Sequence, residues 1–278
     1  MDIMDIIKDS FVFPSKDLGK LAIYIVLSLV ISGLVVGSGI SSIFGLTDSM
    51  AYVGVGVVLF IIALILGFVL SGYNISIIKS GVDLDETAPD YSWKENLITG
   101  IKYLVLSVVY YIIPAIIVVI VAFLTNLPGN AYALINEFSA NMINVNATVN
   151  ATAPVVDTVS NVVMSNFATS LSIVGVVAII LFIIFSILES MGSGRLAKTD
   201  NLVESLNIVE AFKDIGRIGW GKVIATLIIV IVVVIVINFI VSLITQYVPA
   251  IGIVTIIIDP YLTFFVFRAI GLLYSDIA

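Results

Sequence analysis

Cysteine and histidine are both absent from this chain, and charged residues make up only 11% of it. These absences exclude disulfides, a thiol nucleophile, an imidazole for proton transfer near neutral pH, and zinc or haem ligation through these two residue types. The 12 basic residues are outnumbered by 19 acidic ones, and no strongly basic stretch is available to neutralise phosphates. Nucleic-acid binding is therefore excluded, and no cofactor or metal ion is predicted.

Hydrophobic residues, by contrast, make up 60% of the chain, and the mean hydropathy is +1.22. An ordinary soluble domain carries about 25% charged residues, so a chain this apolar is expected to have the lipid bilayer as its solvent. Crossing about 30 Å of hydrocarbon takes about 20 mostly apolar residues. Six segments qualify as spans, namely 21–45, 51–73, 103–124, 171–188, 223–245 and 250–274.

The predicted fold class is all-α, a polytopic membrane protein with six transmembrane helices in a single membrane domain, residues 1–278. Runs of β-branched residues such as "IIVIVVVIVINFIV" would favour a strand in water. In lipid, every backbone N–H and C=O must be satisfied within the segment, and this requirement favours helix. Strands of a membrane barrel would alternate polar with apolar residues, and these segments do not.

The distribution of lysine and arginine predicts the orientation. The connections 46–50, 125–170 and 246–249 contain no basic residue, whereas the N-terminal segment and the connections 74–102 and 193–222 hold every one except Arg268. Basic residues mark the cytoplasmic side of a multi-pass protein. We therefore expect a cell-membrane protein with both termini and these two long loops in the cytoplasm, and with Arg268 snorkelling from the inner end of the last span.

Amphipathic segments are predicted on both sides of the membrane. Residues 1–20 place Asp2, Asp5 and Asp9 opposite isoleucines at helical spacing, which predicts an interfacial N-terminal helix lying on the membrane. A loosely ordered leader is the alternative. In the external Asn-rich loop, 125–170, the stretches 131–143 and 155–167 are amphipathic, and we expect short helices on the outer surface there.

Two acceptor sequons for N-glycosylation lie in the external loop, at Asn146 and Asn150. Their place on the predicted outer side makes them candidate glycosylation sites. Such triplets also arise by chance where Asn and Thr are abundant, so an unmodified, solvated linker is the alternative.

The two long cytoplasmic loops align with each other without gaps, placing Lys79 on Lys198 and Gly100 on Gly219. In each copy a span ends, polar residues follow, and an amphipathic helix leads into the next span; the helices are "DYSWKENLITGIKYLV" and "EAFKDIGRIGWGKVIA". Both copies enter and leave on the same side, so the repeat is parallel, unlike the inverted repeats of many transporters. A chance similarity between two amphipathic linkers is the alternative.

These motifs carry a resemblance to a known family. "FVFPSKDLGKLAIYIVLSLVISG", "GYNISIIKSG", "YSWKENLITGIKYLVLSVVYYIIP", "GRLAKTDNLVESLNIVEAFKDIGRIGWGK" and the tail "DPYLTFFVFRAIGLLYSDIA" resemble archaeal and bacterial six-span membrane proteins catalogued as domain of unknown function 4013. The likeness covers nearly the whole chain. It implies a polytopic membrane protein with no assigned activity. The membrane portion of some glycerophosphodiester phosphodiesterases is similar in style, but their catalytic domain has no counterpart here.

Asp259 is the main candidate for an intramembrane polar site. It lies about ten residues from the outer end of its span, or about 15 Å into the membrane at the helical rise of 1.5 Å per residue, where an ionised carboxylate costs about 2.5–3.5 kcal/mol. One interpretation is a proton or cation site, with Asn238 of the fifth span as partner. The other is structural: Asp259 caps a half-helix that begins at Pro260, so that the span breaks at 258–259.

The third span adds Tyr110 and Tyr111, two hydroxyls beside a mid-membrane kink predicted at Pro114. We include both tyrosines in the candidate polar site. Tyrosines between helices more commonly serve packing with a single hydrogen bond, and that is the alternative.

On the inner face, Lys213, Arg217 and Lys222 lie close in sequence to Trp220. Cations beside an interfacial tryptophan suit the anionic headgroups of the inner leaflet. We therefore predict lipid contact at these four residues.

Two functional hypotheses follow. The first is a non-enzymatic membrane or envelope component whose partners are the lipid bilayer and other membrane proteins. The second is a small transporter or channel for an unidentified ion or small molecule, with its path at Asp259. An intramembrane enzyme is disfavoured, because aspartyl chemistry needs two carboxylates that share a proton and only one deep carboxylate is predicted.

Overall fold

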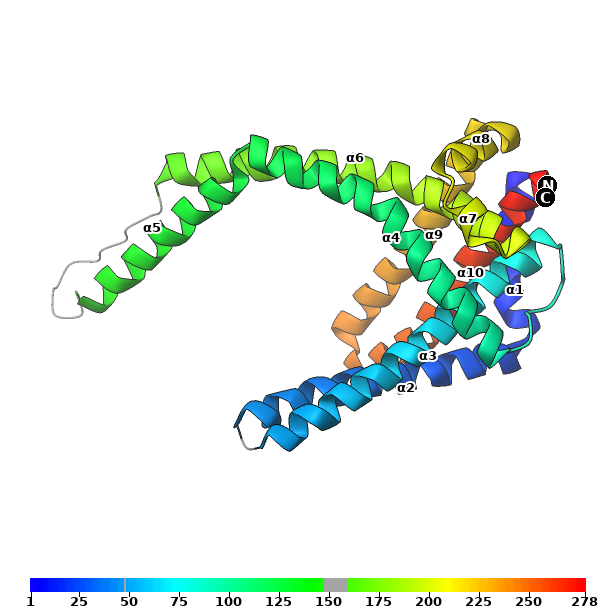
Figure 1. Ribbon diagram of the computed structural model, residues 1–278, viewed down its shortest axis with the longest axis horizontal. Helices are drawn as coiled ribbons and strands as arrows, with labels where there is room; N and C mark the ends of the chain where they lie inside the picture. The colour runs from blue at the N-terminus through cyan, green and yellow to red at the C-terminus, as the bar shows by residue number, and fades with distance from the viewer. Residues whose placement is uncertain (48, 148–159) are drawn as a thin grey trace. The chain divides into compact units, whose positions relative to one another are not determined.

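The computed structural model describes residues 1–47, 49–147 and 160–278, and within these ranges the chain is helical with no strand, which confirms the all-α prediction (Figure 1). The elements are α1 (Ile3–Lys16), α2 (Leu18–Thr47), α3 (Met50–Val82), α4 (Trp93–Leu124), α5 (Leu127–Ala147), α6 (Asn161–Thr199), α7 (Leu202–Ser205), α8 (Ile208–Ile218), α9 (Trp220–Tyr247), the 3₁₀ turn η1 (Pro249–Val254), α10 (Thr255–Tyr274) and η2 (Ser275–Ile277).

Six helices of the described part are long and apolar enough to cross a membrane: Leu18–Leu46, Met50–Val82, Trp93–Leu124, Asn161–Thr199, Trp220–Tyr247 and Gly252–Ile277. The polytopic helical class is thereby confirmed. These helices extend beyond the apolar segments seen in the sequence. α3 has 33 residues, or about 50 Å at 1.5 Å per residue, and it continues well into the predicted loop 74–102. Hydropathy ends a span at its first polar residues, whereas the backbone hydrogen-bond ladder continues wherever nothing interrupts it.

The contacts divide the chain into two compact units, Met1–Val109 with Ile187–Ala278 (unit 1) and Tyr110–Ser186 (unit 2). Unit 2 contains α5 and the adjoining parts of α4 and α6. There the Asn130 side-chain amide donates to the Asn166 carbonyl (3.3 Å) and to Ser170 Oγ (3.1 Å). The structure thus holds a 21-residue helix, α5, in much of the predicted external loop.

The rest of the predicted external loop is described only in part. Asn146 lies in the last turn of α5, whereas Asn150 lies outside the described residues. The short surface helix expected at 155–167 is not a separate element where the structure describes it, because residues from Asn161 onward form the first turns of α6.

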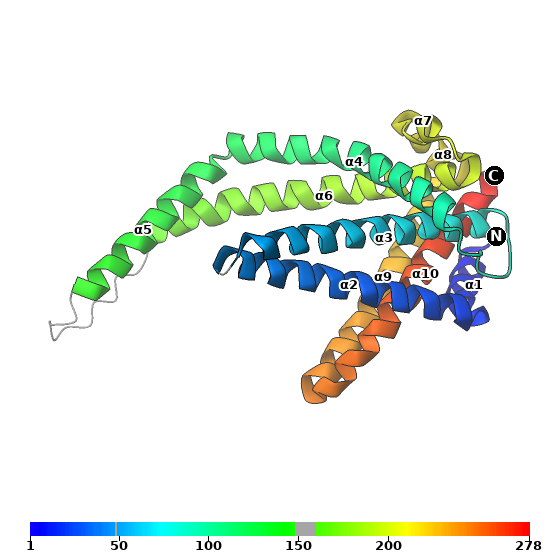
Figure 2. The same cartoon turned by 60° about the horizontal axis from the view of Figure 1, so that its bottom comes forward.

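Unit 1 is built around α3, which packs against α2 and α10 (Figures 1 and 2). The backbone of α3 also approaches two other helices closely, α10 and α4. A Cβ on Gly271 of α10 would lie 2.2 Å from the carbonyl oxygen of Ile78, and a Cβ on Gly72 would lie 1.8 Å from the carbonyl oxygen of Asn96 on α4. Glycine is therefore required where α3 crosses α10 and α4.

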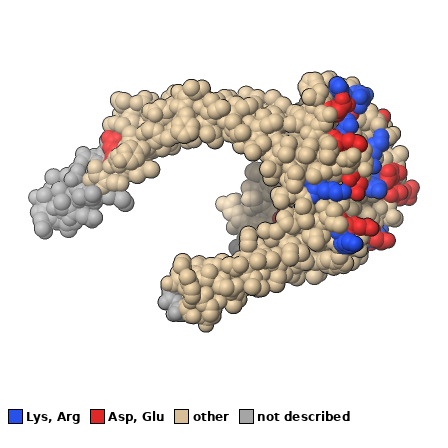
Figure 3. All heavy atoms as spheres, viewed as in Figure 1, with Lys and Arg blue, Asp and Glu red and all other residues tan. Residues whose placement is uncertain are grey.

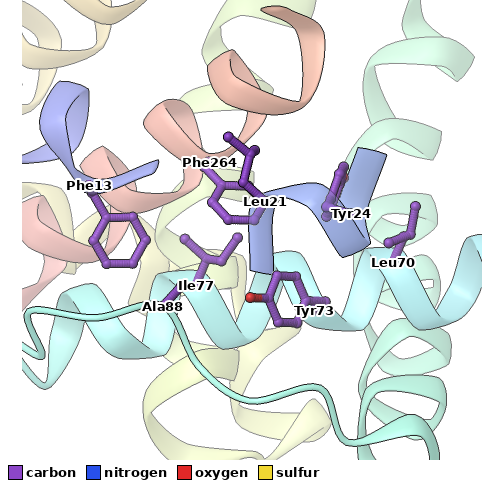
Figure 4. Close-up of a cluster of buried hydrophobic side chains, with 8 residues drawn as sticks. All are labelled: Phe13, Leu21, Tyr24, Leu70, Tyr73, Ile77, Ala88 and Phe264. Atoms are coloured by element: carbon purple, nitrogen blue, oxygen red, sulfur yellow. The ribbon is translucent and has the colours of Figure 1, made fainter. Parts of the chain in front are cut away.

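A cluster of buried side chains fills the space between α1, α2, α3, the 83–92 connection and α10 (Figure 4). Its members are Phe13, Leu21, Tyr24, Leu70, Tyr73, Ile77, Ala88 and Phe264. Tyr73 stacks on Tyr91 of the connection at 3.9 Å between ring centroids, and Tyr24 meets Phe264 edge to face at 5.2 Å. These aromatic contacts join the N-terminal segment, the middle of the chain and the last span.

Helix α1 is amphipathic, as predicted, and it contacts α10 and α9, with Ile6 and Phe13 fully buried. The expectation that Arg268 snorkels to water was wrong. Its side chain does not snorkel to water but is 2% exposed, with Nε donating to Asp9 Oδ1 at 3.0 Å and the guanidinium lying 4.4 Å from the Phe13 ring centroid. The carboxylate of α1 reaches the arginine, so pairing replaces solvation.

Charged side chains gather at one end of unit 1, where both termini lie (Figures 1 and 3). We call residues 1–24, 67–102, 187–226 and 260–278 the polar end, and residues 28–47, 50–66 and 231–259 the distal half. All 12 basic residues belong to the polar end. In the distal half Asp259 is the single charged residue among those that the structure describes.

The two copies of the proposed repeat differ at one glycine. Gly100 lies inside α4, so the first amphipathic segment and its span form one helix from Trp93 to Leu124. Gly219 has φ +107°, a conformation that side chains rarely adopt, and it separates α8 from α9. A distinct amphipathic helix before the span is therefore present in the second copy, whereas in the first it is continuous with the span.

Candidate functional site

Asp259 lies in the second turn of α10, not at a helix start. α10 begins at Thr255, directly after η1, and Pro260 lies inside it as the sixth residue. The interpretation of Asp259 as the cap of a half-helix is therefore corrected. The turn starts upstream at Pro249, and the Thr255 hydroxyl donates to the Gly252 carbonyl at 2.6 Å where the 3₁₀ turn passes into α-helix. Pro260 removes only its own hydrogen bond.

One side of Asp259 faces a cavity of about 290 Å³ between α2 and α10. Two polar rows line it. Tyr24, Ser28 and Ser32 come from α2, and Thr255, Asp259 and Thr263 come from α10. Each row has a spacing of four residues, which puts its members on one face of a helix. Of these six residues, Asp259 alone was predicted from the sequence, although the i, i+4 spacing of the five hydroxyl residues within apolar helices is a detectable signal.

The other side of Asp259 faces a second cavity of about 290 Å³, which Asn238 of α9 also lines. The predicted partners thus share a cavity, but within the described residues no hydrogen bond joins them. The Asn238 amide nitrogen instead donates to the Val234 carbonyl at 3.0 Å. A third cavity, of about 550 Å³, lies between the C-terminal end of α9 and the start of α10, and both Asn238 and Thr255 line it.

Three of the hydroxyls around Asp259 give their protons to backbone carbonyls. Ser32 donates to the Ser28 carbonyl at 2.9 Å, Thr263 donates to the Asp259 carbonyl at 2.8 Å, and Thr255 donates to Gly252 as described. A hydroxyl that gives its proton to the backbone keeps only lone pairs for the cavity. With the carboxylate, the lining therefore favours a cation or a proton donor as its occupant.

The charge of Asp259 has no protein partner in the described part of the chain: its side chain is exposed and forms no ion pair there. The described residues also contain no group of three or more acidic side chains that could hold a metal ion. A single carboxylate surrounded by hydroxyls and one amide oxygen matches the charge of a monovalent cation better than that of a divalent one.

Tyr110 and Tyr111 belong to unit 2. Tyr110 is fully buried, and Tyr111 stacks on Phe182 with ring centroids 5.9 Å apart. Pro114 lies inside α4, which continues through it to Leu124.

Of the four residues predicted to contact inner-leaflet lipid, Lys213 and Arg217 lie on α8, and Trp220 and Lys222 lie in the first turn of α9. Lys213 pairs with Glu210 at 2.7 Å, and this contact lowers the pKa of Glu210 below its ordinary value. Arg217 pairs with the buried Asp214 at 2.8 Å. Lys222 bonds to Asp276 and to the carbonyl of Met1.

Asp214 anchors α8 to the polar end. It is 1% exposed and also accepts from Arg195 on α6 and, at 3.1 Å, from the Tyr274 hydroxyl on α10. The outward side of this region presents Phe212 against Trp220, with centroids 4.9 Å apart and both side chains exposed. The cations are thus partly neutralised by carboxylates, and the exposed aromatic pair is the part of the surface that suits lipid.

A second buried carboxylate, Glu189, escaped the sequence analysis because it lies one residue beyond the predicted span 171–188. It is 8% exposed and accepts from Ser107 Oγ at 3.2 Å and from Ser193 Oγ at 3.4 Å. Glu189 lines none of the three cavities around Asp259. The hydroxyl partners of Glu189 lie on α4 and α6, whereas the cavities at Asp259 are lined by α2, α9 and α10.

Six apolar spanning helices with a polar site on the last of them define an integral, multi-pass membrane protein. The chain belongs to the family described as "Protein of unknown function (DUF4013)", whose sequence model matches residues 55–246. That range covers more than half of the chain but not the whole length of the resemblance seen in the sequence. It includes Asn238 and ends before Asp259.

An uncharacterized protein of Methanocaldococcus jannaschii is similar to this chain, with 32% identity over 74 residues. The match covers 25% of this chain and 26% of the relative, so the chain spans about a quarter of that protein. No solved structure matches the chain.

Proposed function

We propose that this protein binds a small monovalent cation, protons included, at Asp259 and conducts or transports it across the cell membrane. The supporting observation is a carboxylate that has no ion pair among the described residues and lies beside hydroxyls that give their protons to the backbone. The competing structural interpretation required a helix cap, and Asp259 is not at a helix start. The proposal is a non-enzymatic one.

Electrostatics support this assignment. An ionised carboxylate at mid-membrane depth costs about 2.5–3.5 kcal/mol unless it is paired or meets water, and Asp259 has no cationic partner among the described residues. A bound cation would offset that cost. Because Asn238, Thr255 and Asp259 each line two of the three cavities, neighbouring cavities meet at shared side chains. This is the arrangement expected of a path with several weak sites.

The orientation is part of the proposal. All 12 basic residues lie in the polar end, and basic residues are retained on the cytoplasmic side. We infer that the polar end and both termini are cytoplasmic and that the distal half points outward. The cavity between the C-terminal end of α9 and the start of α10 then opens toward the outside.

Flux measurements test the proposal. The full chain is reconstituted into liposomes with a pH-sensitive or sodium-sensitive dye inside, and flux is driven by a gradient of H⁺, Na⁺ or K⁺. We expect Asp259→Asn to reduce flux on the order of tenfold or more, because one charged acceptor is worth about 1.5–3 kcal/mol. Asp83→Asn, an exposed acid in the polar end, is the matched control and should conduct normally. Absence of flux for all three ions in the wild type would refute the proposal.

A second function, a structural or partner-binding membrane component, is favoured by a different observation. In the distal half, α9 buries only Val241 among the described residues, and large apolar side chains such as Ile235 and Phe239 are exposed. Lipid or other membrane proteins would cover them. A spin label at Ile235→Cys, in this cysteine-free chain, distinguishes the two proposed functions. If the label is shielded from lipid-dissolved oxygen in native membranes but not in liposomes, and no flux is measured, the protein is a structural or partner-binding component.

A further inference from the structure

A second polar cavity lies in the polar end, away from Asp259, at the meeting point of α3, α4 and the end of α6. Its volume is about 230 Å³. Its lining residues are Ile75, Ser76, Lys79, Glu95, Asn96, Thr99, Leu196, Ala197 and Asp200. All of them belong to unit 1, and none lines the cavities of the proposed cation path.

Asn96 is the group that points to a ligand. Its side chain is 3% exposed, its Oδ1 accepts from Ser76 Oγ at 3.2 Å, and its Nδ2 has no partner. Buried polar groups are nearly always hydrogen-bonded, and an exception in a native structure calls for an explanation. The Gly72 contact holds α4 against α3 at this residue, so the amide is kept in place at the wall of the cavity with its Nδ2 unpaired.

The charged groups around Asn96 complete the chemistry. Lys79 and Glu95 are exposed and, among the described residues, neither forms an ion pair, whereas Asp200 is paired with Lys102 at 2.7 Å. The cavity thus has one unpaired cation beside an amide donor and one unpaired carboxylate. A donor set of Lys79 and Asn96 recognises an anionic oxygen group, and Glu95 recognises a cationic one.

We propose that this cavity binds a small zwitterion, with its anionic oxygen group on Asn96 Nδ2 and Lys79 Nζ and its ammonium group at Glu95. A cavity of 230 Å³ is smaller than the roughly 300–1,000 Å³ of drug-sized pockets, so the ligand has few heavy atoms. A free solute and the headgroup of a phosphatidylethanolamine share this chemistry. The inference does not rest on the cation path, and a failed flux assay leaves it unchanged.

The test is a titration of the full chain in detergent with O-phosphoethanolamine, which carries both groups, and with inorganic phosphate, which carries only the anion. Asn96→Asp keeps the acceptor for Ser76 but replaces the donor with a negative charge. Lys79→Gln removes the cation at an exposed position, where folding is not at stake. We expect both to weaken phosphoethanolamine binding at least tenfold. Glu95→Gln should weaken phosphoethanolamine but not phosphate.

Lys94→Gln is the matched control, because Lys94 is an exposed neighbour of Glu95 that does not line the cavity; its binding should equal that of the wild type. A parallel measurement in nanodiscs compares phosphatidylethanolamine with phosphatidylcholine. Binding of phosphatidylethanolamine but not of phosphatidylcholine, with that binding lost in Lys79→Gln, identifies a lipid headgroup as the source of the zwitterion. Wild-type protein that binds neither probe, variants that bind as the wild type does, or a Lys94→Gln chain that is equally weakened would each overturn the proposal.

Discussion

The polar end and the distal half of unit 1 are built from the same helices but are held together differently. In the polar end, α10 is buried along most of its length from Pro260 to Tyr274, and ion pairs join α6 to α8, α9 to η2, and α1 to α10. In the distal half the buried positions are few and mainly small, such as Ser38, Gly56 and Ala63. Asp259 and Pro260 mark the boundary, one exposed and the next buried.

This difference indicates where stability and function lie. A lipid-facing apolar side chain gains little from folding, because the unfolded helix is already in hydrocarbon. Stability must therefore come from the polar end, where packed and charged groups meet. The distal half is free to carry a charged residue without a partner, which is what a site for a mobile cation requires.

The largest expected effect comes from the ion pair that fastens α1. Asp9→Ala leaves Arg268, 2% exposed, without its counter-charge, and breaking a buried pair in this way costs about 4 kcal/mol. The thermal midpoint of the detergent-solubilised protein should fall sharply. Asp5→Ala, on the same helix and exposed, is the control. Equal midpoints for the two variants would mean that the polar end does not depend on this pair.

A pair of matched truncations compares the two regions directly. Ile77→Ala removes a fully buried side chain from the aromatic cluster in Figure 4 and should destabilise unit 1 by about 3 kcal/mol. Ile235→Ala removes the same atoms from a position 60% exposed in the distal half and should cost less than about 0.5 kcal/mol. Unfolding in mixed micelles with increasing denaturing detergent measures both. Similar costs would show that the distal half is covered by protein.

The crossing of α3 and α10 gives a smaller effect. A Cβ at Gly271 would meet the Ile78 backbone at 2.2 Å, so Gly271→Ala must push the helices apart, at about 2 kcal/mol. A Cβ at Gly67 of α3 would meet nothing within 4 Å, so Gly67→Ala should be neutral or slightly stabilising. The same unfolding assay applies. If Gly271→Ala leaves the free energy of unfolding unchanged, the close contact between α3 and α10 is not at this glycine.

Much of this organisation could be predicted from the sequence, and the predictions that were wrong have a common cause. Hydropathy and the distribution of lysine and arginine depend on local composition, and they located the six spans and the gathering of charge at one end. Helical spacing also put Asp9 on the polar face of α1, but no local pattern says that its partner is Arg268, far along the chain. Burial of that arginine depends on tertiary packing, which no local sequence pattern predicts.

Asp259 and Glu189 show the same limit at the sites. The Asp–Pro pair satisfies the local rule for a helix start, yet the start is set upstream by Pro249 and the Thr255 hydroxyl. Glu189 lies just past the last apolar residue of its predicted span, and only the longer α6 reveals it as buried. Local rules compete with one another, and packing decides among them.

The smallest expected effect on stability is at Asp259 itself. Because its side chain forms no ion pair in the described residues and does not cap α10, Asp259→Asn should lower the free energy of unfolding by less than about 0.5 kcal/mol. Removal of an ionised group at membrane depth would only offset that loss. This contrasts with Asp9, a carboxylate of the polar end. The measurement is the same thermal midpoint, read at pH 7 beside Asp9→Ala. A stable Asp259→Asn protein that has lost cation flux separates function from folding, because the substitution removes only the charge. A loss of stability comparable to that of Asp9→Ala would instead mean that Asp259 has a buried partner, and the distal half would then be held together as the polar end is.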